Sequence, residues 1–473
     1  ERIGPPLKAA HDDPKGQGTL TVAWRMPNGD LKRVGDFQAY QQNLVRRGQE
    51  ASSKKKTTGE IKGKGVCCIC GRQGVEVSGL LQIPNFKFYT LDKPGSVSGG
   101  FDPKFAWRNF PVCKECSDGA DYSGERIRKE LSFDFYGFKY LVLPSPVFTR
   151  STGAYEFLPR LVKARLEPQS IRRLTDTEED LLYLISLERD LLQVDLLFYE
   201  PDPNYFRPAL YVSGLLPCCF RALFEAKARV DDHPWLKPPF AKGEFTFKAL
   251  RVVFPSSRNR GRYDYDFLQA TRAALELRVF PTGRLLSVGM RWVQQDFVQQ
   301  RAWRASLSAL FRTVLFFEVL TQADSKGGSD VQIDYGDTDQ ADRVRRVFSQ
   351  CSGKLKESAA AQAAFLVGAC CRRIEVIQWQ VRKATPFVGK YKGLRLAQED
   401  VQGLFKEAKA KAQAYGSEEE NKVRELLTCA AAALVAAPDR WELSPDEASY
   451  FFALGNALSG RLAKEQEEGD TGQ

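Results

Sequence analysis

The sequence predicts a multidomain α+β protein in which strands give way to helices along the chain. Its 473 residues are enough for two to four domains, and its 43% hydrophobic and 27% charged content is typical of a soluble globular protein. Strand-like segments gather before residue 150, a mixed region follows, and helical patterns fill the rest. We therefore expect an N-terminal α/β region at 1–150, a mixed, mainly helical domain at 151–340 and a helical bundle at 341–473.

The N-terminal region combines strand and turn signals with a lysine-rich stretch. Asn28 and Gly29 follow a β-prone segment at 19–26, which predicts a hairpin. A short helix is expected at 36–47. Residues 51–64, rich in Ser, Lys, Thr and Gly, are expected to be flexible until bound. Aromatic and β-branched residues predict two further strands, at 86–90 and 133–142.

In the middle region, a capping box and two apolar patterns mark the elements. Thr175 and Glu178 precede leucines that continue to Leu196, which predicts a helix. Alternating apolar and polar residues predict a strand at 245–254, whereas 303–320 is apolar enough for a buried helix. A Gly/Asp/Ser-rich linker is expected at 324–340.

The C-terminal bundle has two clear helical signals. Apolar residues recur at three- and four-residue steps from Ala363 to Val381, which predicts one helix face. Ser444, Pro445 and Glu447 form a helix start, with Ser as the cap and Pro at the first helical position. The stripe expected to face the core after this start is Phe451, Leu454, Leu458 and Leu462.

The strongest chemical signal is a pair of Cys-x-x-Cys motifs about forty residues apart. Cys67 and Cys70 form the first motif, and Cys113 and Cys116 form the second. Two residues between thiols let both sulfurs meet one ion, and two such motifs complete a tetrahedral site with no open position. We therefore expect structural zinc in a module at about 64–120. Four reduced cysteines with accidental spacing, or an iron–sulfur cluster, are the alternatives.

Cysteine usage and apolar patterning indicate the compartment. The chain has eleven cysteines, an odd number, which does not fit a secreted disulfide scaffold and favours a reducing compartment. The seven cysteines outside the two motifs are expected to be small buried residues. The sequence contains neither a signal peptide nor a run of eighteen apolar residues, so we expect no membrane span.

A net charge of +10 favours an anionic partner, nucleic acid first and a membrane surface second. Three basic groups could contact phosphates. The first group runs up to the cysteine module and comprises Lys54, Lys55, Lys56, Lys62 and Lys64. The second group, in a loop, comprises Arg258, Arg260 and Arg262. The third group, on the bundle, comprises Arg372, Arg373, Arg382, Lys383, Lys390, Lys392 and Arg395. For each group the alternative is an ordinary solvated surface.

Aromatic residues surround the cysteine motifs and allow two interpretations. They could stack on bases, but we favour their packing into the small core of the module. The residues concerned are Phe86, Phe88, Tyr89 and Trp107.

The sequence offers little for catalysis. Histidine occurs only as His11 and His233, and we expect His233 to be a turn residue because it precedes Pro234. There is no phosphate-binding P-loop, Rossmann fingerprint or nucleophile elbow in a suitable context. We therefore expect a binding protein rather than an enzyme.

At this point the motifs become specific enough to suggest a family. The segments that carry the likeness are Cys67 to Gly71, Phe86 to Gly95 and Trp107 to Cys116 in the first half, and 386–394 and 441–458 in the second. Together they resemble the large subunit of type I-B CRISPR Cascade complexes. Between these segments the likeness rests on length and order. Members of that family usually carry more sequence upstream, and the chain begins at Glu1 rather than Met, so we expect the natural N-terminus to lie further upstream.

The resemblance implies a non-enzymatic, RNA-guided DNA-binding subunit in the cytoplasm of a prokaryote. Its N-terminal region would sit at the 5′ handle of the guide RNA, check the protospacer-adjacent motif and help to open target double-stranded DNA. Its bundle resembles the Cascade small subunit, which lines a DNA strand. The implied partners are the guide RNA, the Cascade backbone and handle-binding subunits, the small subunit, and either a helicase-nuclease or transposition proteins. The metal ligands carried over are the four cysteines of the two motifs.

Two alternatives belong to other classes. The first is an autonomous zinc-dependent nuclease or RNA-processing enzyme, which needs an open metal site or a carboxylate cluster. The second is a zinc-ribbon transcription or chromatin factor, which would bind duplex DNA without a guide.

Overall fold

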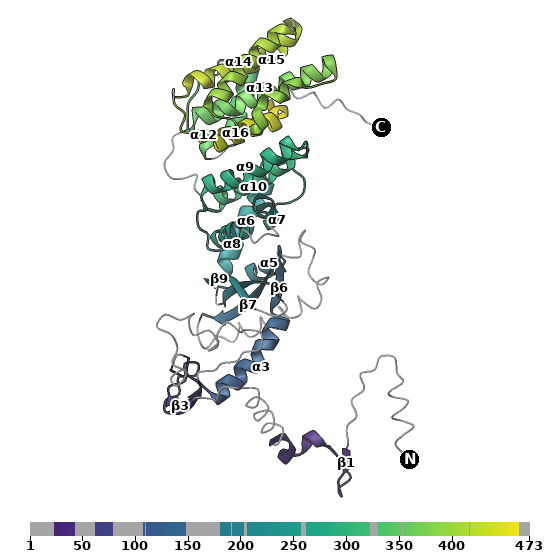
Figure 1. Cartoon of the computed structure of the whole chain (residues 1–473), viewed down its shortest axis with the longest axis vertical. Coiled ribbons are helices and arrows are strands. Elements are labelled where there is room, and N and C mark those ends of the chain that lie inside the picture. The colour runs from purple at the N-terminus through teal and green to yellow at the C-terminus, as the bar shows by residue number, and fades with distance from the viewer. Residues whose placement is uncertain are drawn as a thin grey trace, which may run out of the picture. The chain divides into compact units, whose positions relative to one another are not determined.

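The computed structural model describes residues 23–42, 62–78, 107–108, 110–147, 180–190, 192–202, 206–256, 262–321, 330–351, 353–415 and 417–462. They fall into two compact units, Glu1–Glu125 and Arg126–Gln473. Small sheets precede a large set of helices, so the predicted α+β class is confirmed (Figure 1). The boundaries expected near residues 150 and 340 stay predictions. Over the described ranges, no helix combines the length and apolar character needed to cross a bilayer.

The first unit begins with a hairpin. β1 (Ala23–Arg25) pairs antiparallel with β2 (Leu31–Arg33), and Gly29 in the turn has a φ of 89°. The hairpin predicted from Asn28 and Gly29 is therefore confirmed. A short 3₁₀ helix, η1 (Val34–Asp36), and a helical turn at 38–42 follow, within the span predicted to be helical.

A second sheet of this unit carries the cysteine motifs. Its strands are antiparallel and lie in the order β3 (Lys62–Gly65), β4 (Val75–Ser78), β5 (Val112–Cys113). The helix α3 (Lys114–Glu130) follows β5 directly. The prediction that 51–64 is flexible was wrong for residues 62–64, because Lys62 and Lys64 pair with Ser78 and Glu76 of β4. The strand predicted at 86–90 lies outside the described residues.

The second unit begins with a four-stranded antiparallel sheet in sequence order. Its strands are β6 (Ser132–Phe135), β7 (Phe138–Pro146), β8 (Leu192–Glu200) and β9 (Arg207–Leu215). The single strand predicted at 133–142 is in fact the hairpin of β6 and β7. Tyr136 and Gly137 form its turn with φ values of 46° and 94°, and two positive φ values are what a tight hairpin requires. The aromatic-rich segment on both sides hid this turn, because tyrosine rarely adopts positive φ.

The helix predicted to run from Thr175 to Leu196 was wrong in its second half. Within the described residues the helix is α5 (Asp180–Ser186), and Leu192 and Leu196 belong to β8. Side chains of β8 are buried at alternate positions, as a strand with one face on a core requires. Leucine spacing alone did not separate the helix from the strand.

The strand predicted at 245–254 was also wrong, because this segment forms α7 (Phe247–Val253). Thr246 caps the helix by accepting a hydrogen bond from the backbone N–H of Lys248 at 3.3 Å. Phe247 and Leu250 are fully buried one turn apart, and the Phe247 ring lies 5.5 Å from that of Phe135. Packing of one helix face onto the sheet therefore decided the local structure.

Helices continue the second unit beyond the sheet. They are α6 (Pro217–Asp231), α8 (Arg262–Leu275), α9 (Thr282–Val298) and α10 (Trp303–Thr321). The apolar helix predicted at 303–320 is confirmed as α10, which is buried over most of its length.

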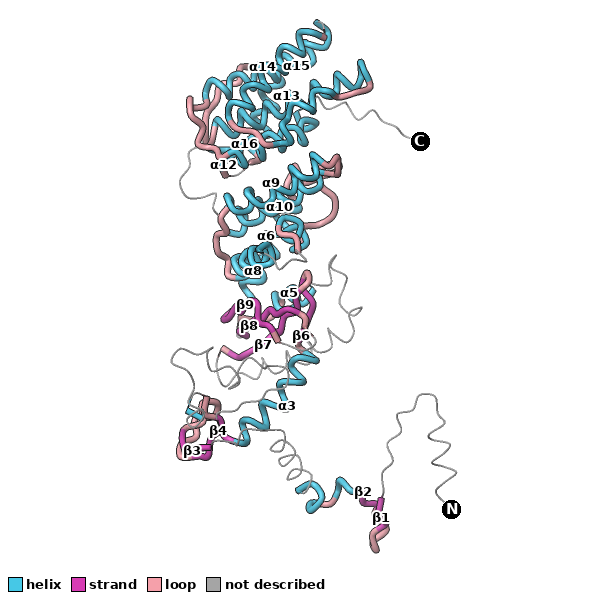
Figure 2. Tube along the Cα trace, in the orientation of Figure 1, coloured by secondary structure: helices cyan, strands magenta, loops and turns pink. Residues whose placement is uncertain are grey.

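The C-terminal part is a bundle, and every regular element described after Leu215 is helical (Figure 2). Its members are α11 (Asp339–Ser349), α12 (Lys354–Glu357), α13 (Ala359–Arg382), η6 (Pro386–Leu394), α14 (Gln398–Ala414), α15 (Ser417–Ala436), α16 (Pro445–Leu458) and η7 (Ser459–Leu462). The core-facing stripe from Phe451 to Leu462 is buried as predicted. The stripe on α13 ends at Ile377, because Val381 is 58% exposed.

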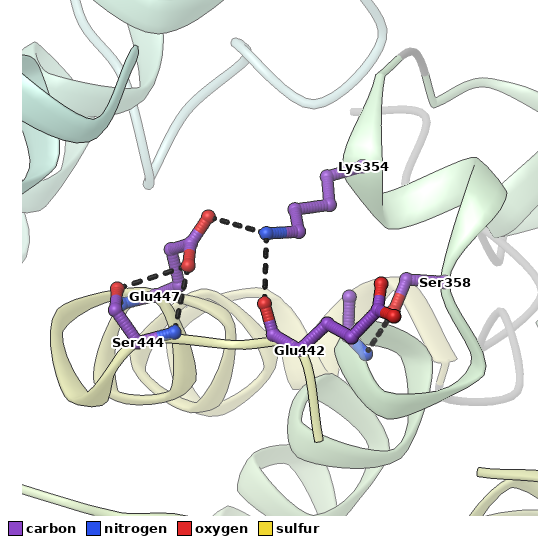
Figure 3. A network of polar contacts seen from close by, with 6 residues as sticks. Lys354, Ser358, Glu442, Ser444 and Glu447 are labelled. Carbon is purple, nitrogen blue, oxygen red and sulfur yellow. Dashed lines mark hydrogen bonds and ion pairs between the residues drawn. The ribbon is translucent and has the colours of Figure 1, made fainter. Parts of the chain in front are cut away.

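The start of α16 follows the capping box predicted from the sequence. Ser444 Oγ accepts a hydrogen bond from the backbone N–H of Glu447, and the Glu447 carboxylate accepts one from the backbone N–H of Ser444. Lys354 of α12 donates to the same carboxylate at 2.7 Å and to the Glu442 carbonyl at 3.2 Å, so the cap also ties α12 to α16 (Figure 3).

Two glycines let α13 and α16 approach at backbone distance. A Cβ on Gly455 would lie 1.7 Å from the carbonyl oxygen of Phe365, and one on Gly368 would lie 2.0 Å from that of Phe452. No side chain can be added at such a crossing without separating the helices. The bundle is built around this contact.

We predict that Gly455→Ala lowers the free energy of unfolding of the second unit by at least about 2 kcal/mol, because the added methyl group overpacks the crossing. The matched control is Gly403→Ala in α14, where an added Cβ meets no atom within 4 Å. That change should stabilise by about 0.5–1 kcal/mol through helix propensity. Urea unfolding of both variants is the measurement, and equal midpoints would contradict the packing account.

Candidate functional site

The two cysteine motifs converge at one end of the β3-β4-β5 sheet, where β3 and β5 both end. Cys67 and Cys70 lie in the turn after β3, where the N–H of Gly71 donates to the Cys67 carbonyl at 2.9 Å. Gly71 and Gly74 have φ values of 70° and 69°, a conformation that favours glycine, so these turns need glycine. Cys113 ends β5, and Cys116 lies in the first turn of α3.

The four sulfur atoms lie within 4.8 Å of one another, and the Cys70 and Cys113 sulfurs are 3.9 Å apart. Zinc–sulfur bonds of about 2.3 Å in a tetrahedron place neighbouring sulfurs about 3.8 Å apart. The spacing therefore fits a four-thiolate metal site. Four sulfurs would fill all four positions of a tetrahedral ion and would leave none for water or substrate.

Backbone donors prepare the cysteines for an ion. The N–H of Cys113 points at the Cys67 sulfur at 3.4 Å, and this hydrogen bond is the main reason that the pKa of Cys67 falls to about 6. In contrast, burial raises the pKa of Cys116 to about 12, with the other cysteines adding to the rise. Metal binding by all four thiolates releases the protons that the thiols carry, so metal affinity should rise with pH.

Arg72 contacts the cysteine cluster, although the sequence analysis did not single it out. Its Nε lies 3.3 Å from the Cys70 sulfur and its Nη2 lies 3.7 Å from the Cys113 sulfur, while Nη2 also donates to the Glu115 carboxylate. The guanidinium is the main reason that the pKa values of Cys70 and Glu115 are lowered. A basic residue two positions after a metal motif was the available signal.

Trp107 belongs to the small core of the module. A Cβ on Gly63 would lie 2.4 Å from the indole ring, so the ring lies against the glycine face of β3. The fully buried apolar residues here are Cys67, Val77, Val112 and Cys113, and Trp107 packs against them while half-buried. For Trp107, core packing is therefore confirmed; Phe86, Phe88 and Tyr89 lie outside the described residues.

The first two basic groups are only partly described. Lys62 and Lys64 are exposed on β3, and Lys62 pairs with Glu76 at 3.0 Å. Arg262 begins α8. The remaining members, Lys54, Lys55, Lys56, Arg258 and Arg260, lie outside the described residues, and both groups stay predictions.

The third basic group divides into paired and unpaired cations. Carboxylates bind three of its members, in the pairs Arg372–Glu375 at 2.6 Å, Lys390–Glu407 at 2.9 Å and Lys392–Asp400 at 2.5 Å. The other members are Arg373, Arg382, Lys383 and Arg395, for which no ion pair with a described residue exists. Arg373 is half-buried, whereas the other three are exposed around the end of α13 and along η6.

Arg372 also joins a buried polar network. Glu375 is 3% exposed and accepts hydrogen bonds from Arg372, from Tyr391 Oη and from Asn456 Nδ2 at 2.8 Å. Arg304 of α10 donates to Asn456 Oδ1 at 3.0 Å. The network ties α10 to the bundle. Because Arg372 is bound to Glu375 within this network, its role there is structural.

His233 lies in the turn after α6, as predicted. Its Nδ1 accepts from the backbone N–H of Trp235 at 3.2 Å, and its Nε2 donates to the Gln350 carbonyl at 3.1 Å. Burial lowers the pKa of the His233 imidazole. The four cysteines are the sole candidate metal cluster found in the described ranges.

Comparison with known families now identifies the class of protein. A family model for the central domain of CRISPR-associated protein TM1802 matches residues 64–214, and a model for its C-terminal domain matches residues 245–470. These matches cover most of the chain and begin at the metal module. The chain belongs to the TM1802 family of CRISPR-associated proteins. A comparison with curated proteins found no match.

We predict that Cys113→Ser abolishes metal binding and unfolds the cysteine module, because a structural zinc contributes about 10–16 kcal/mol in small modules. Cys68→Ser is the matched control, since Cys68 is exposed and lies outside the four-sulfur cluster. Metal content by mass spectrometry and limited proteolysis near residue 70 report the outcome. A Cys113→Ser chain that keeps its metal would contradict the assignment.

Arg72→Gln should weaken metal affinity by about 10- to 100-fold, the usual effect of removing a partner that holds the ligands. The free energy of unfolding of the second unit should not change. Competition with a chromophoric chelator measures the affinity. Equal metal affinities of the wild type and Arg72→Gln would show that Arg72 does not support metal binding by the cysteines.

Proposed function

We propose that this chain is the non-catalytic large subunit of a type I-B CRISPR Cascade complex. In this role it binds the 5′ handle region of the guide RNA, recognises the protospacer-adjacent motif, and helps to open and hold target DNA. It works beside the Cascade backbone and handle-binding subunits and the small subunit, and it recruits a helicase-nuclease or transposition proteins. These actions place it in the prokaryotic cytoplasm.

The observation that carries the proposal is the closed four-sulfur cluster in a member of a CRISPR-associated family. Catalytic zinc keeps one coordination position open for water or substrate, whereas four cysteines fill all four. Zinc bound by the four cysteines would brace the module and supply no reactive water. The module would therefore serve as a rigid scaffold for contacts with RNA or duplex DNA.

The charge distribution fits the same role. In RNA-guided complexes, base pairing reads the target sequence, and protein contacts the backbone and a short duplex motif. Cations for such contacts occur on β3 at Lys64 and at the end of α13 at Arg382 and Lys383. The bundle that carries α13 corresponds in position to the small-subunit-like domain expected from the sequence.

No observation favours the nuclease or RNA-processing alternative. Such an enzyme needs an open metal or a carboxylate cluster, and within the described residues the cysteine cluster is the one metal-type group. A guide-independent zinc-ribbon factor is less consistent with the family to which the chain belongs.

Co-expression with the neighbouring CRISPR genes and a guide RNA tests the proposal. An affinity-tagged chain should recover the guide RNA and the backbone subunits, and the assembled complex should protect target DNA next to one short motif. Cys68→Ser should recover the same partners, and Cys113→Ser should lose them. Recovery of the wild-type chain without RNA or backbone subunits, or hydrolysis of nucleic acid by the chain alone, would refute the proposal.

A further inference from the structure

The C-terminal end of α13 exposes a large aromatic side chain. Trp379 is 56% exposed, although Ile377 and Gln378 beside it are 3% and 2% exposed. An indole that projects from a well-packed helix leaves a broad apolar face in water, which disfavours the isolated chain. A ligand that covers this face would remove that cost.

The surroundings of Trp379 are rigid. The buried Gln378 side chain accepts a hydrogen bond from the backbone N–H of Phe387 at 3.0 Å, which ties the helix end to η6. Lys383 ends α13 in the left-handed conformation, and its N–H donates to the Trp379 carbonyl at 3.0 Å. Arg382 lies over the Tyr415 ring at 5.5 Å. The helix end is therefore held in place before any ligand arrives.

The helix end that follows Trp379 is basic. From residue 376 to 398 the sequence contains five cations and no Asp or Glu, and Glu375, one turn before Trp379, is buried and bound by Arg372. Carboxylates of α14 pair with Lys390 and Lys392, but no described carboxylate pairs with Arg382 or Lys383. Arg382 lies three residues after Trp379, on the same side of the helix, and Lys383 follows it at the end of α13. Two exposed cations therefore lie within four residues of the indole.

The second exposed apolar residue nearby does not extend the patch. Val381 is 58% exposed, but two residues along a helix turn it about 200° away from Trp379. A protein-docking surface would be expected to have several apolar side chains on one face. A lone aromatic ring between cations is instead the pattern of a base-stacking platform.

We propose that Trp379, Arg382 and Lys383 form a binding site for single-stranded nucleic acid, in which one base stacks on the indole and the two cations hold adjacent phosphates. The site takes a single strand because a duplex hides its base faces. This inference rests on the proposed function and specifies where the bundle holds a strand. Either a DNA strand or an RNA strand offers the required chemistry.

The test uses the purified full chain and labelled oligonucleotides of about 16 nucleotides, a length that covers the usual site size of single-strand-binding proteins. Oligothymidylate and oligouridylate distinguish DNA from RNA as the source, and a duplex of equal length is the competitor. Trp379→Ala should weaken binding of the preferred strand about 10-fold, whereas Trp379→Phe should retain most of the affinity. Val381→Ala, on the other side of the same helix end, is the matched control and should bind as the wild type does.

Two further readouts separate ligand contact from a structural effect. An oligonucleotide carrying 5-iodouracil should form a photo-crosslink that peptide mass spectrometry locates at Trp379. Replacing both Arg382 and Lys383 with Ala should reduce the slope of log affinity against log salt by about 1.4, the value for two phosphate contacts on a single strand. The thermal midpoint of Trp379→Ala should match that of Val381→Ala.

The platform is refuted if Trp379→Ala binds as tightly as Val381→Ala, if the crosslink maps to another residue, or if duplex competes as well as single strands. Failure of the proposed function looks different, because it consists of the wild-type chain failing to recover guide RNA and backbone subunits. If the wild-type chain joins the complex but Trp379→Ala binds single strands as tightly as the wild type does, the platform is refuted and the proposed function stands.

Discussion

The convergence of four thiols is the constraint on which the N-terminal module depends. Its described core has four fully buried apolar residues, and two of these are the cysteines Cys67 and Cys113. An ion joined to all four sulfurs would tie the turn after β3 to the end of β5 and the start of α3. Arg72 would compensate part of the negative charge that such a site collects.

The second unit is stabilised differently. One hydrophobic core runs from Leu131 in the strand region to Leu462 at the end of the bundle. The glycine-lined crossing of α13 and α16 brings backbones into contact, and the Glu375 network fixes α10 beside it. Middle and C-terminal segments thus share a core although the sequence suggests a linker between them. The consequence for function is that the cations at the end of α13 are held by a rigid body.

Much of this could be predicted from the sequence, and the failures have physical causes. The cysteine spacing, the Asn28-Gly29 hairpin and the Ser444 cap are local signals, and the structure confirms the clustering of the four cysteines, the hairpin and the cap. The segments at 133–142 and 245–254 were misassigned because tertiary packing, not local propensity, chose their structure. Likewise, neither Arg72 nor Trp379 belongs to a motif. Arg72 contacts Cys113 and Glu115 about forty residues further along the chain, and the exposure of Trp379 shows only in the folded bundle.

The proposed role is that of a scaffold, in which the four-cysteine site would brace the N-terminal module and the helical bundle would present cations at the end of α13. The central claim is that the metal has no coordination position left for chemistry. X-ray absorption at the metal edge of the purified chain tests this most directly. The account predicts zinc with four sulfur neighbours at about 2.3 Å and no lighter ligand. An oxygen or nitrogen neighbour in place of one sulfur, or the spectrum of an iron–sulfur cluster, would contradict it.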